Sequence, residues 1–242
     1  MFDPSPDLCA GGRIEDGACL SAAKVSRHAL PLPPPMNVTR LRKTSRPAGS
    51  AGKRSLDAVL ALGLLLFLTP LLLLVALLVA VESRGPVFFR QRRTGYEGEI
   101  FRIYKFRTMR VCEDGPVIRQ ASRDDERLTR IGALLRKASI DEVPQLINIL
   151  QGEMSLVGPR PHAVAHDQNF RGFLPDYDRR FEARPGITGL AQLRGQRGET
   201  RSIACMAGRV SSDLEYIDTW SLRADLEILL RSFGIPFRSH GY

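Results

Sequence analysis

The 242-residue chain has only four cysteines, and no two of them form a C-x-x-C pair. Disulfide frameworks and structural zinc sites need cysteines at close, regular spacings. Their absence argues against a small fold held together by disulfides or zinc. The four cysteines are therefore expected to be ordinary thiols: Cys9, Cys19, Cys112 and Cys205.

Nucleotide-binding fingerprints are missing as well. The chain contains no Rossmann glycine pattern, and the GKRS sequence at residues 52–55 lacks the first glycine of a Walker motif and has no strand before it. A Rossmann or Walker nucleotide fold is therefore not expected. If the protein handles phosphate groups, it does so with another arrangement of residues.

Charge is absent from residues 58–81, a run that Thr69 and Pro70 interrupt near its middle. A straight helix of this length would reach about 36 Å, enough for a hydrocarbon core of about 30 Å. Basic residues flank both ends, although only the cytoplasmic flank of a spanning helix should be enriched in them. Since proline kinks helices, we expect a re-entrant membrane helix over residues 51–84 that enters and leaves by one leaflet. An ordinary signal anchor with a tolerated proline is the alternative, whereas a cleaved signal peptide is not expected.

Acidic residues are missing from residues 36–54, which hold six lysines and arginines. The whole chain has a net charge of +9 and a sequence pI near 9.9, so anionic partners are expected. Anionic lipid and phosphate-bearing substrates explain this charge, and nucleic acid is a further candidate. Residues 1–50 are Pro-rich and have no sustained apolar period, so we expect a disordered basic tail.

Residues 85–237 have globular character. Residues 88–109 read as two short strands joined by a turn at Gly95–Gly98, and Leu128–Leu135 form an amphipathic helical stripe. A further helix is expected from near Asp141 to Leu150, residues 184–200 are expected to be loop, and residues 214–233 mostly helical. The apolar face of that last helix suits either the core or a membrane interface. The expected fold class is therefore α+β and mainly α: a re-entrant membrane helix packed on a small globular domain with amphipathic interfacial helices and a short β-hairpin.

Two adjacent acids, Asp141 and Glu142, stand at a helix start. The cap of that helix is either Ser139, as part of a capping box, or Asp141. In both registers the acids lie in the first turn, where the helix dipole favours an ionised carboxylate that serves as nucleophile or metal ligand. The alternative is that both acids only stabilise the helix.

Basic groups of the same domain could meet phosphate. On a strand, Lys105 and Arg107 would point from one face, Arg160 lies in a rigid GPRP turn, and Arg136 precedes the acids by about one helical turn. Carboxylates among such cations suit phosphoryl transfer assisted by Mg²⁺, whereas the alternative is a network of surface ion pairs. His162 and His166 share a helical spacing, but no glutamate accompanies them as in a zinc motif, so a transition-metal site is not expected there.

Five ordered segments carry a resemblance to a known family: KRSLDAVLAL, QRRTGYEGEIFRIYKFRTM, LLRKASIDEVPQLINILQGEMSLVGPRP, RPGITGLAQLRGQRGET and RVSSDLEYIDTWSLRADLEIL. Over about residues 53–235 the chain resembles the bacterial sugar transferases, which are monotopic polyprenyl-phosphate phosphoglycosyl transferases. Thr69-Pro70 stands where the family more often has Ser-Pro. Threonine can make the same bond to an upstream carbonyl.

The resemblance implies transfer of a sugar 1-phosphate from a UDP-sugar to polyprenyl (undecaprenyl) phosphate with release of UMP, as the first step of exopolysaccharide or capsule assembly. It implies that Asp141 is the nucleophile of a covalent intermediate and that Glu142 and Mg²⁺ organise the site. It also implies that Lys105, Arg136, Arg160 and Asp213 line or support the phosphate pocket. The RGQRGET sequence resembles the branch that uses glucose or galactose, with an N-acetylated amino sugar as the alternative. Candidate sugar-loop residues are Arg194, Arg197 and Glu199.

Three classes of function remain: this transferase, a membrane-anchored basic binding protein, and a structural anchor without chemistry. The ordered acid and arginine motifs favour the transferase, because charge alone requires neither DE at a helix start nor GPRP after it. We therefore expect a protein of the bacterial inner membrane with its catalytic domain on the cytoplasmic face. The expected partners are a UDP-hexose, polyprenyl phosphate and membrane lipid, without nucleic acid, and a homo-oligomer is compatible with the sequence.

Overall fold

The computed structural model describes residues 47–110, 125–196, 198, 200 and 202–232. Of the tail predicted for residues 1–50, only the last four residues fall within these ranges. They form a short 3₁₀ helix, η1 (Pro47–Gly49), and the N-cap of the first α-helix. The cap is Ser50, whose hydroxyl accepts a hydrogen bond from the backbone nitrogen of Lys53 at 3.2 Å.

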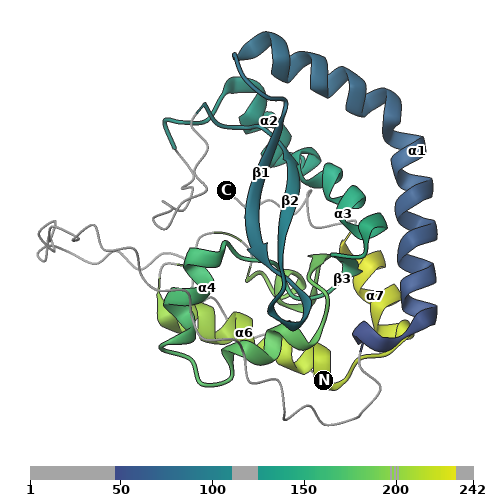
Figure 1. Ribbon diagram of the computed structural model, residues 1–242, viewed down its shortest axis with the longest axis vertical. Helices are drawn as coiled ribbons and strands as arrows, with labels where there is room; N and C mark the ends of the chain where they lie inside the picture. The colour runs from purple at the N-terminus through teal and green to yellow at the C-terminus, as the bar shows by residue number, and fades with distance from the viewer. Residues whose placement is uncertain (1–46, 111–124, 197, 199, 201, 233–242) are drawn as a thin grey trace, which may run out of the picture. The chain divides into compact units, whose positions relative to one another are not determined.

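The described chain is mainly helical and has two small sheets (Figure 1), which confirms the α+β, mainly α prediction. Its helices are α1 (Ala51–Glu82), α2 (Arg130–Lys137), α3 (Leu146–Gln151), α4 (Val164–Arg171), α5 (Leu190–Leu193), α6 (Ile203–Asp218) and α7 (Leu222–Ser232). Short 3₁₀ segments are η2 (Tyr96–Gly98), η3 (Ile140–Gln145) and η4 (Tyr177–Glu182). The strands are β1 (Phe88–Thr94), β2 (Ile100–Phe106), β3 (Ser155–Val157) and β4 (Gly186–Thr188).

Helix α1 is continuous through Pro70, so the expected break is a bend within one helix. Figure 1 shows α1 turning over the rest of the chain in its C-terminal part. Thr69 Oγ1 donates to the carbonyl of Leu65 at 2.7 Å, the threonine back-bond expected from the sequence. The helix is long and apolar enough to cross a membrane, and only 11% of its most apolar 18-residue window is buried. Leucines so exposed are unlike those of a soluble core helix.

The N-terminal end of α1 is fastened to the rest of the described chain. Lys53, with 4% of its surface exposed, donates to the Asp225 carboxylate of α7 at 2.7 Å and to the Val157 carbonyl at 3.1 Å. Asp57, one turn later, accepts from the Ser155 hydroxyl at 2.6 Å.

Its neighbour Arg54 donates to the carbonyls of Ile149 and Leu150 at the end of α3, which lies beside α1 (Figure 1). Lys53 and Arg54, which the sequence assigned to a polybasic membrane flank, therefore bind protein groups.

The C-terminal end of α1 is held by the same domain. Glu82 accepts a hydrogen bond from the backbone nitrogen of Ile131 in α2 at 2.9 Å. Arg107, just after β2, donates to the Ser83 and Arg84 carbonyls that end the helix. An apolar cluster of Val75, Val79, Phe106 and Leu135 lies beside these contacts.

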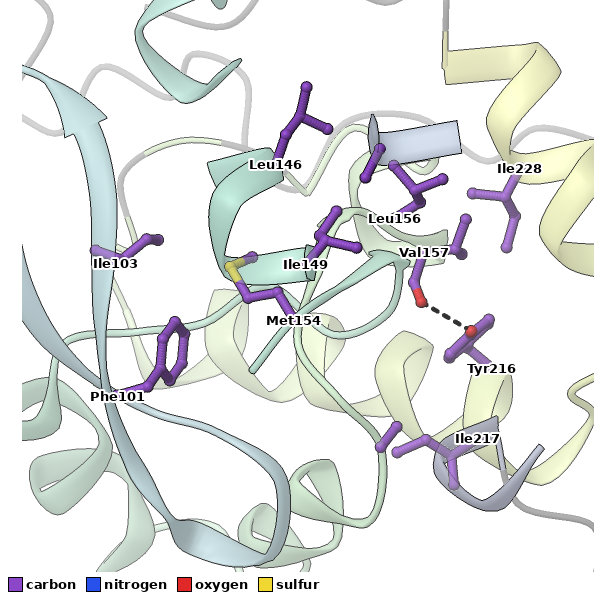
Figure 2. Close-up of a cluster of buried hydrophobic side chains, with 12 residues drawn as sticks. Phe101, Ile103, Leu146, Ile149, Met154, Leu156, Val157, Tyr216, Ile217 and Ile228 are labelled. Carbon is purple, nitrogen blue, oxygen red and sulfur yellow. Dashed lines mark hydrogen bonds between the residues drawn. The ribbon is translucent and has the colours of Figure 1, made fainter. Parts of the chain in front are cut away.

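Strands β1 and β2 form the predicted antiparallel hairpin, with Phe88 paired to Phe106 and Thr94 to Ile100. Alternation along β2 sends Phe101 and Ile103 into the main core. Figure 2 shows this core: Ile149 and Met154 lie between the hairpin and the side chains of α6 and α7. The Tyr216 hydroxyl lies 3.1 Å from the Val157 carbonyl there.

One expectation about the C-terminal half was wrong. The predicted loop at 184–200 contains β4, which pairs in parallel with β3, and α5. Gly186 permits this pairing, because a Cβ there would lie 2.1 Å from the backbone nitrogen of Gly158. The described part of 214–233 is mostly helical, as predicted, but it belongs to two helices: α6 begins at Ile203, where the Ser202 hydroxyl caps it, and α7 follows from Leu222.

Candidate active site

The acidic pair, Asp141 and Glu142, lies in the first turn of η3. Of the two predicted caps, Ser139 takes the N-cap position of η3, but without the predicted side-chain bond. Ser139 adopts a left-handed conformation with φ of 58° and makes no side-chain cap bond, while Asp141 lies inside the 3₁₀ segment. The left-handed residue reverses the chain directly after α2, and both carboxylates are buried, with 7% and 6% of their residues' surfaces exposed.

Glu142 is held by two cations. Lys105 Nζ, from β2, donates to Oε1 at 2.7 Å, and the Arg160 guanidinium donates to both Glu142 oxygens, with Nη1 3.1 Å from Oε2. Charge-assisted contacts of this kind are the strong ones, and a fork-to-carboxylate pair fixes orientation. Lys105, Arg160 and Glu142 are therefore brought together, as the sequence predicted, and Glu142 is fixed in place.

Asp141 differs from its neighbour. No residue in the described ranges makes a hydrogen bond to its carboxylate. Burial raises the pKa of Asp141 to about 6, the Glu142 charge adds to the rise, and the nearby cations Lys105, Arg136 and Arg160 oppose it. An unbound carboxylate with this pKa is ionised at neutral pH and free to react.

Arg136, in the last turn of α2, is beside the pair. Its Nε donates to the Thr108 hydroxyl at 2.9 Å, and its charge is among those that lower the pKa of Asp141. Burial lowers the pKa of the Lys105 ammonium, although Glu142 counteracts this. The acids thus face three cations from three different elements, α2, β2 and the GPRP turn.

Arg107 is placed elsewhere. The strand ends at Phe106, and the Arg107 guanidinium bonds to Ser83 and Arg84 at the end of α1, not to the acidic pair. The expectation that Lys105 and Arg107 share one face therefore failed, because the strand stops before the alternation reaches Arg107.

Asp213, in α6, is buried behind the site and meets Arg180 of η4. Arg180 Nε donates to Asp213 at 2.8 Å, and Nη2 donates to the Arg160 carbonyl at 2.8 Å. The sequence analysis missed Arg180. A fully buried arginine is rare without partners, but nothing local in the sequence indicates which arginine is buried, because its partners are 20 and 33 residues away.

The sugar-loop candidates are only partly described. Arg194 follows α5 and donates through both terminal nitrogens to the Glu215 carboxylate of α6, at 2.7 and 2.6 Å. Both side chains are nearly half exposed. Arg197 and Glu199 lie outside the described residues. Arg194, the sugar-loop candidate that lies within the described residues, thus connects its loop to α6.

His162 and His166 do not share a helical face, because His162 precedes α4. His162 is buried, and its ring contacts Tyr177, Arg180 and Arg209. Burial, reinforced by the Arg180 charge, lowers the pKa of His162 to about 3, so the imidazole is neutral. A small crevice beside it is lined by residues of the hairpin tip, the GPRP turn and η4, among them Thr94, Arg160 and Phe181.

Whether Mg²⁺ fits this site depends on the oxygen ligands that the site's side chains offer. Within the described ranges no group of three or more His, Cys, Asp or Glu side chains gathers, so these residues form no closed cage. Mg²⁺ is usually held by one or two carboxylates together with substrate phosphates and water. Asp141, whose carboxylate makes no hydrogen bond to any described residue, and the adjacent Glu142 fit such an open site.

Comparison with known proteins gives a consistent result. Residues 48–239 match the family described as bacterial sugar transferase. The chain is 50% identical over 212 residues to the UDP-glucose:undecaprenyl-phosphate glucose-1-phosphate transferase of Caulobacter vibrioides, covering 86% of this chain and 79% of that protein. It is 49% identical over 177 residues to the Escherichia coli K12 protein of the same name, covering 73% and 38%. It is 45% identical over 182 residues to the exopolysaccharide production protein PSS of Rhizobium leguminosarum bv. phaseoli, covering 73% and 90%.

Proposed function

Because the chain belongs to the bacterial sugar transferase family, we propose that it transfers glucose 1-phosphate from UDP-glucose to undecaprenyl phosphate, for exopolysaccharide synthesis. The Caulobacter and E. coli relatives carry that activity in their names, and PSS is named for exopolysaccharide production. One observation supports the chemistry: Asp141 is a buried carboxylate without a hydrogen bond in the described chain, beside a glutamate fixed by two cations.

In the first step, a carboxylate oxygen of Asp141 attacks the β-phosphorus of the donor. A phosphorus–oxygen bond forms to the enzyme, and the bond from the β-phosphorus to the bridging oxygen breaks. UMP leaves with that oxygen and its electron pair, so the sugar 1-phosphate remains attached to Asp141 as an acyl phosphate.

In the second step, a phosphate oxygen of the lipid attacks the same phosphorus. The new bond gives the undecaprenyl diphosphate sugar, and cleavage of the acyl phosphate restores the Asp141 carboxylate. The two displacements make the reaction ping-pong, with UMP released before the lipid reacts.

The cations around the acidic pair stabilise charge during both steps. Lys105, Arg136 and Arg160 come from separate elements and all act on the Asp141 charge. Groups that are held in place before reaction stabilise a charged phosphoryl transition state without reorganisation. Glu142 keeps Lys105 and Arg160 in position by accepting from both.

Mg²⁺, held by Asp141 and Glu142, would neutralise negative charge on the donor diphosphate. The residues themselves supply the nucleophile and the orientation. A chelator arm tests the metal: EDTA should stop turnover, and excess Mg²⁺ should restore it, whereas activity unchanged in EDTA removes the metal from the proposal.

We propose that α1 is re-entrant and that both of its ends lie on the cytoplasmic side of the inner membrane. Two sets of contacts support this topology. Lys53 and Asp57 bind α7 and β3 at one end, and Glu82 binds α2 at the other. A helix with both ends fastened to one domain cannot place them on opposite sides of a bilayer.

The transfer is tested by incubating purified protein with UDP-glucose alone. Intact mass spectrometry should show the mass of one hexose phosphate added, with stoichiometric UMP, and Asp141→Asn should abolish both. The matched control is Asp176→Asn, which removes the same charge from an exposed position and should leave the adduct unchanged. An adduct that persists in Asp141→Asn refutes the assigned nucleophile.

Addition of undecaprenyl phosphate should then discharge the adduct. Replacing UDP-glucose by UDP-galactose or UDP-N-acetylglucosamine tests the donor separately. Stronger labelling by the N-acetylated sugar would overturn the donor while leaving the transfer chemistry intact.

A further inference from the structure

Arg180 is at the centre of a buried polar network behind the acidic pair. Only 3% of its surface is exposed, and its guanidinium has three separate acceptors. Nε donates to Asp213 at 2.8 Å, Nη1 to the Tyr177 hydroxyl at 3.0 Å, and Nη2 to the Arg160 carbonyl at 2.8 Å. The guanidinium also lies over the Tyr177 ring, 5.1 Å from its centroid.

The hydrogen bond to the Arg160 carbonyl connects Arg180 to the acidic pair. The Arg160 carbonyl belongs to the GPRP turn, and the side chain of the same residue binds both oxygens of Glu142. Prolines on both sides of Arg160 remove backbone donors that could otherwise anchor this turn. A hydrogen bond from a buried guanidinium therefore fixes the backbone from which the Arg160 side chain reaches the acidic pair.

His162 fixes the other side of the turn. His162 Nε2 lies 3.1 Å from Arg209 Nη1, and Nδ1 of the same ring lies 3.1 Å from both the Tyr177 oxygen and Arg180 Nη1. The Tyr177 hydroxyl donates to Asp167 at 2.6 Å. These buried contacts connect the residue that follows the turn to the same network that contains Arg180.

We propose that Arg180 is a positioning residue that holds the Arg160 backbone, so that the Arg160 guanidinium stays on Glu142 and toward the donor phosphate. Asp213 then acts through Arg180 rather than by touching the donor. The catalytic consequence rests on the proposed function, whereas the positioning itself is a property of the fold and is tested separately. The alternative is that Arg180 and Asp213 only stabilise the protein.

The test uses the full-length protein with Arg180→Lys. Lysine keeps a charge beside Asp213, but a single ammonium cannot span three acceptors in the way that a planar fork does. The matched control is Arg179→Lys, at the neighbouring position, where the arginine is exposed and pairs with Asp218. If Arg180→Lys does not fold, Arg180→Gln combined with Asp213→Asn removes the bond to the Arg160 carbonyl without leaving a buried charge unpaired.

The first readout is hydrogen exchange of the peptide that covers residues 158–163. Loss of one buried bond to a charged donor should speed exchange there roughly tenfold to a hundredfold, and the control should leave it unchanged. Unchanged exchange in Arg180→Lys, or in the Arg180→Gln, Asp213→Asn double variant if that is used, overturns the proposal. This result holds whether or not the protein forms an adduct with UDP-glucose.

The second readout is the rate of adduct formation in two backgrounds. Arg180→Lys should slow it about tenfold or more in the wild-type protein, but by no more than about twofold in Arg160→Ala, because positioning is useless once the positioned group is gone. Equal losses in both backgrounds would mean a general stabilising role and would refute positioning. No adduct in the wild type would count against the proposed function alone.

Discussion

Lys53 Nζ lies 2.7 Å from Asp225 Oδ2, joining two buried side chains that are 172 positions apart in the sequence. The pair connects the first turn of α1 to α7. Tyr216 and Trp220 also donate to Asp225, at 2.8 and 2.9 Å. The carboxylate is thus fully satisfied only when α1 is docked, so this apolar helix is a part of the folded domain.

Lys53→Met is expected to destabilise the protein by about 3–5 kcal/mol, because it leaves the Asp225 charge buried without its cation. Chemical denaturation in detergent micelles measures this. Adding Asp225→Asn should recover part of the loss, since it removes the unpaired charge. Lys137→Met, which removes an exposed lysine, is the control and should change stability little. Equal effects of the two lysine changes would contradict the docking role.

Adduct formation should depend on the ionisation of Asp141. With its pKa raised to about 6 by burial, the carboxylate is charged above that pH, and the rate should fall about tenfold per pH unit well below it. Arg136→Met should move the midpoint to higher pH, because the Arg136 charge lowers the pKa of Asp141. Arg130→Met, an exposed change on the same helix, is the control. Single-turnover rates between pH 4.5 and 8 would show the shift, and a profile without this acidic limb would contradict it.

Asp141→Asn should stabilise the fold at neutral pH. A carboxylate whose folded pKa is above its ordinary value of 3.8 binds a proton more readily when folded, so its charge costs stability at every pH above the folded pKa. A pKa of about 6 corresponds to at most about 3 kcal/mol. The gain should shrink as the pH falls from 6 toward 4, where the wild-type carboxyl is also neutral. Denaturation at pH 7.5 and 4, without divalent metal, measures it against Asp176→Asn.

Membrane topology can be read with cysteines at Ser55 and Arg84, exposed positions near the two ends of α1. In a background without the native cysteines, both should react with an impermeant maleimide only in inside-out vesicles. Labelling of the two positions from opposite sides would establish a spanning helix and remove the re-entrant proposal.

Arg194→Met should leave donor preference nearly unchanged, because the Arg194 guanidinium is bound to Glu215 on α6. An exposed ion pair of this kind contributes about 0–1 kcal/mol. The ratio of kcat/KM for UDP-glucose to that for UDP-N-acetylglucosamine should stay within about twofold of the wild type. Glu215→Gln is the partner control. A larger change of the ratio in Arg194→Met alone would show that Arg194 contacts the sugar.

Local patterns predicted the features that local physics determines. The β-forming residues on either side of a glycine-containing turn correctly predicted the two strands of the hairpin. The uncharged run correctly predicted the long apolar helix α1. Lys105 and Arg160 also lie beside the acidic pair, as their charge and the turn geometry led us to expect, and both contact Glu142.

What local patterns could not predict depends on pairing between distant positions. The short β3–β4 ladder needs Gly158 and Gly186 to approach closely, and neither strand has a periodic pattern. The left-handed Ser139 was read as a cap because serine favours caps. Arg180 looked like its neighbour Arg179, yet one is buried and the other exposed, which only the tertiary fold decides.

Pro70 lies past the middle of α1 and divides it into unequal arms. The arm before Pro70 is about 28 Å long and the arm after it about 18 Å, at 1.5 Å per residue. The shorter arm reaches little more than half of a hydrocarbon core of about 30 Å. A helix fastened at both ends would therefore add its volume mainly to one leaflet, expanding the area of that leaflet relative to the other. The protein should accordingly favour membranes that are convex on the side where its domain lies, as shallow insertions do.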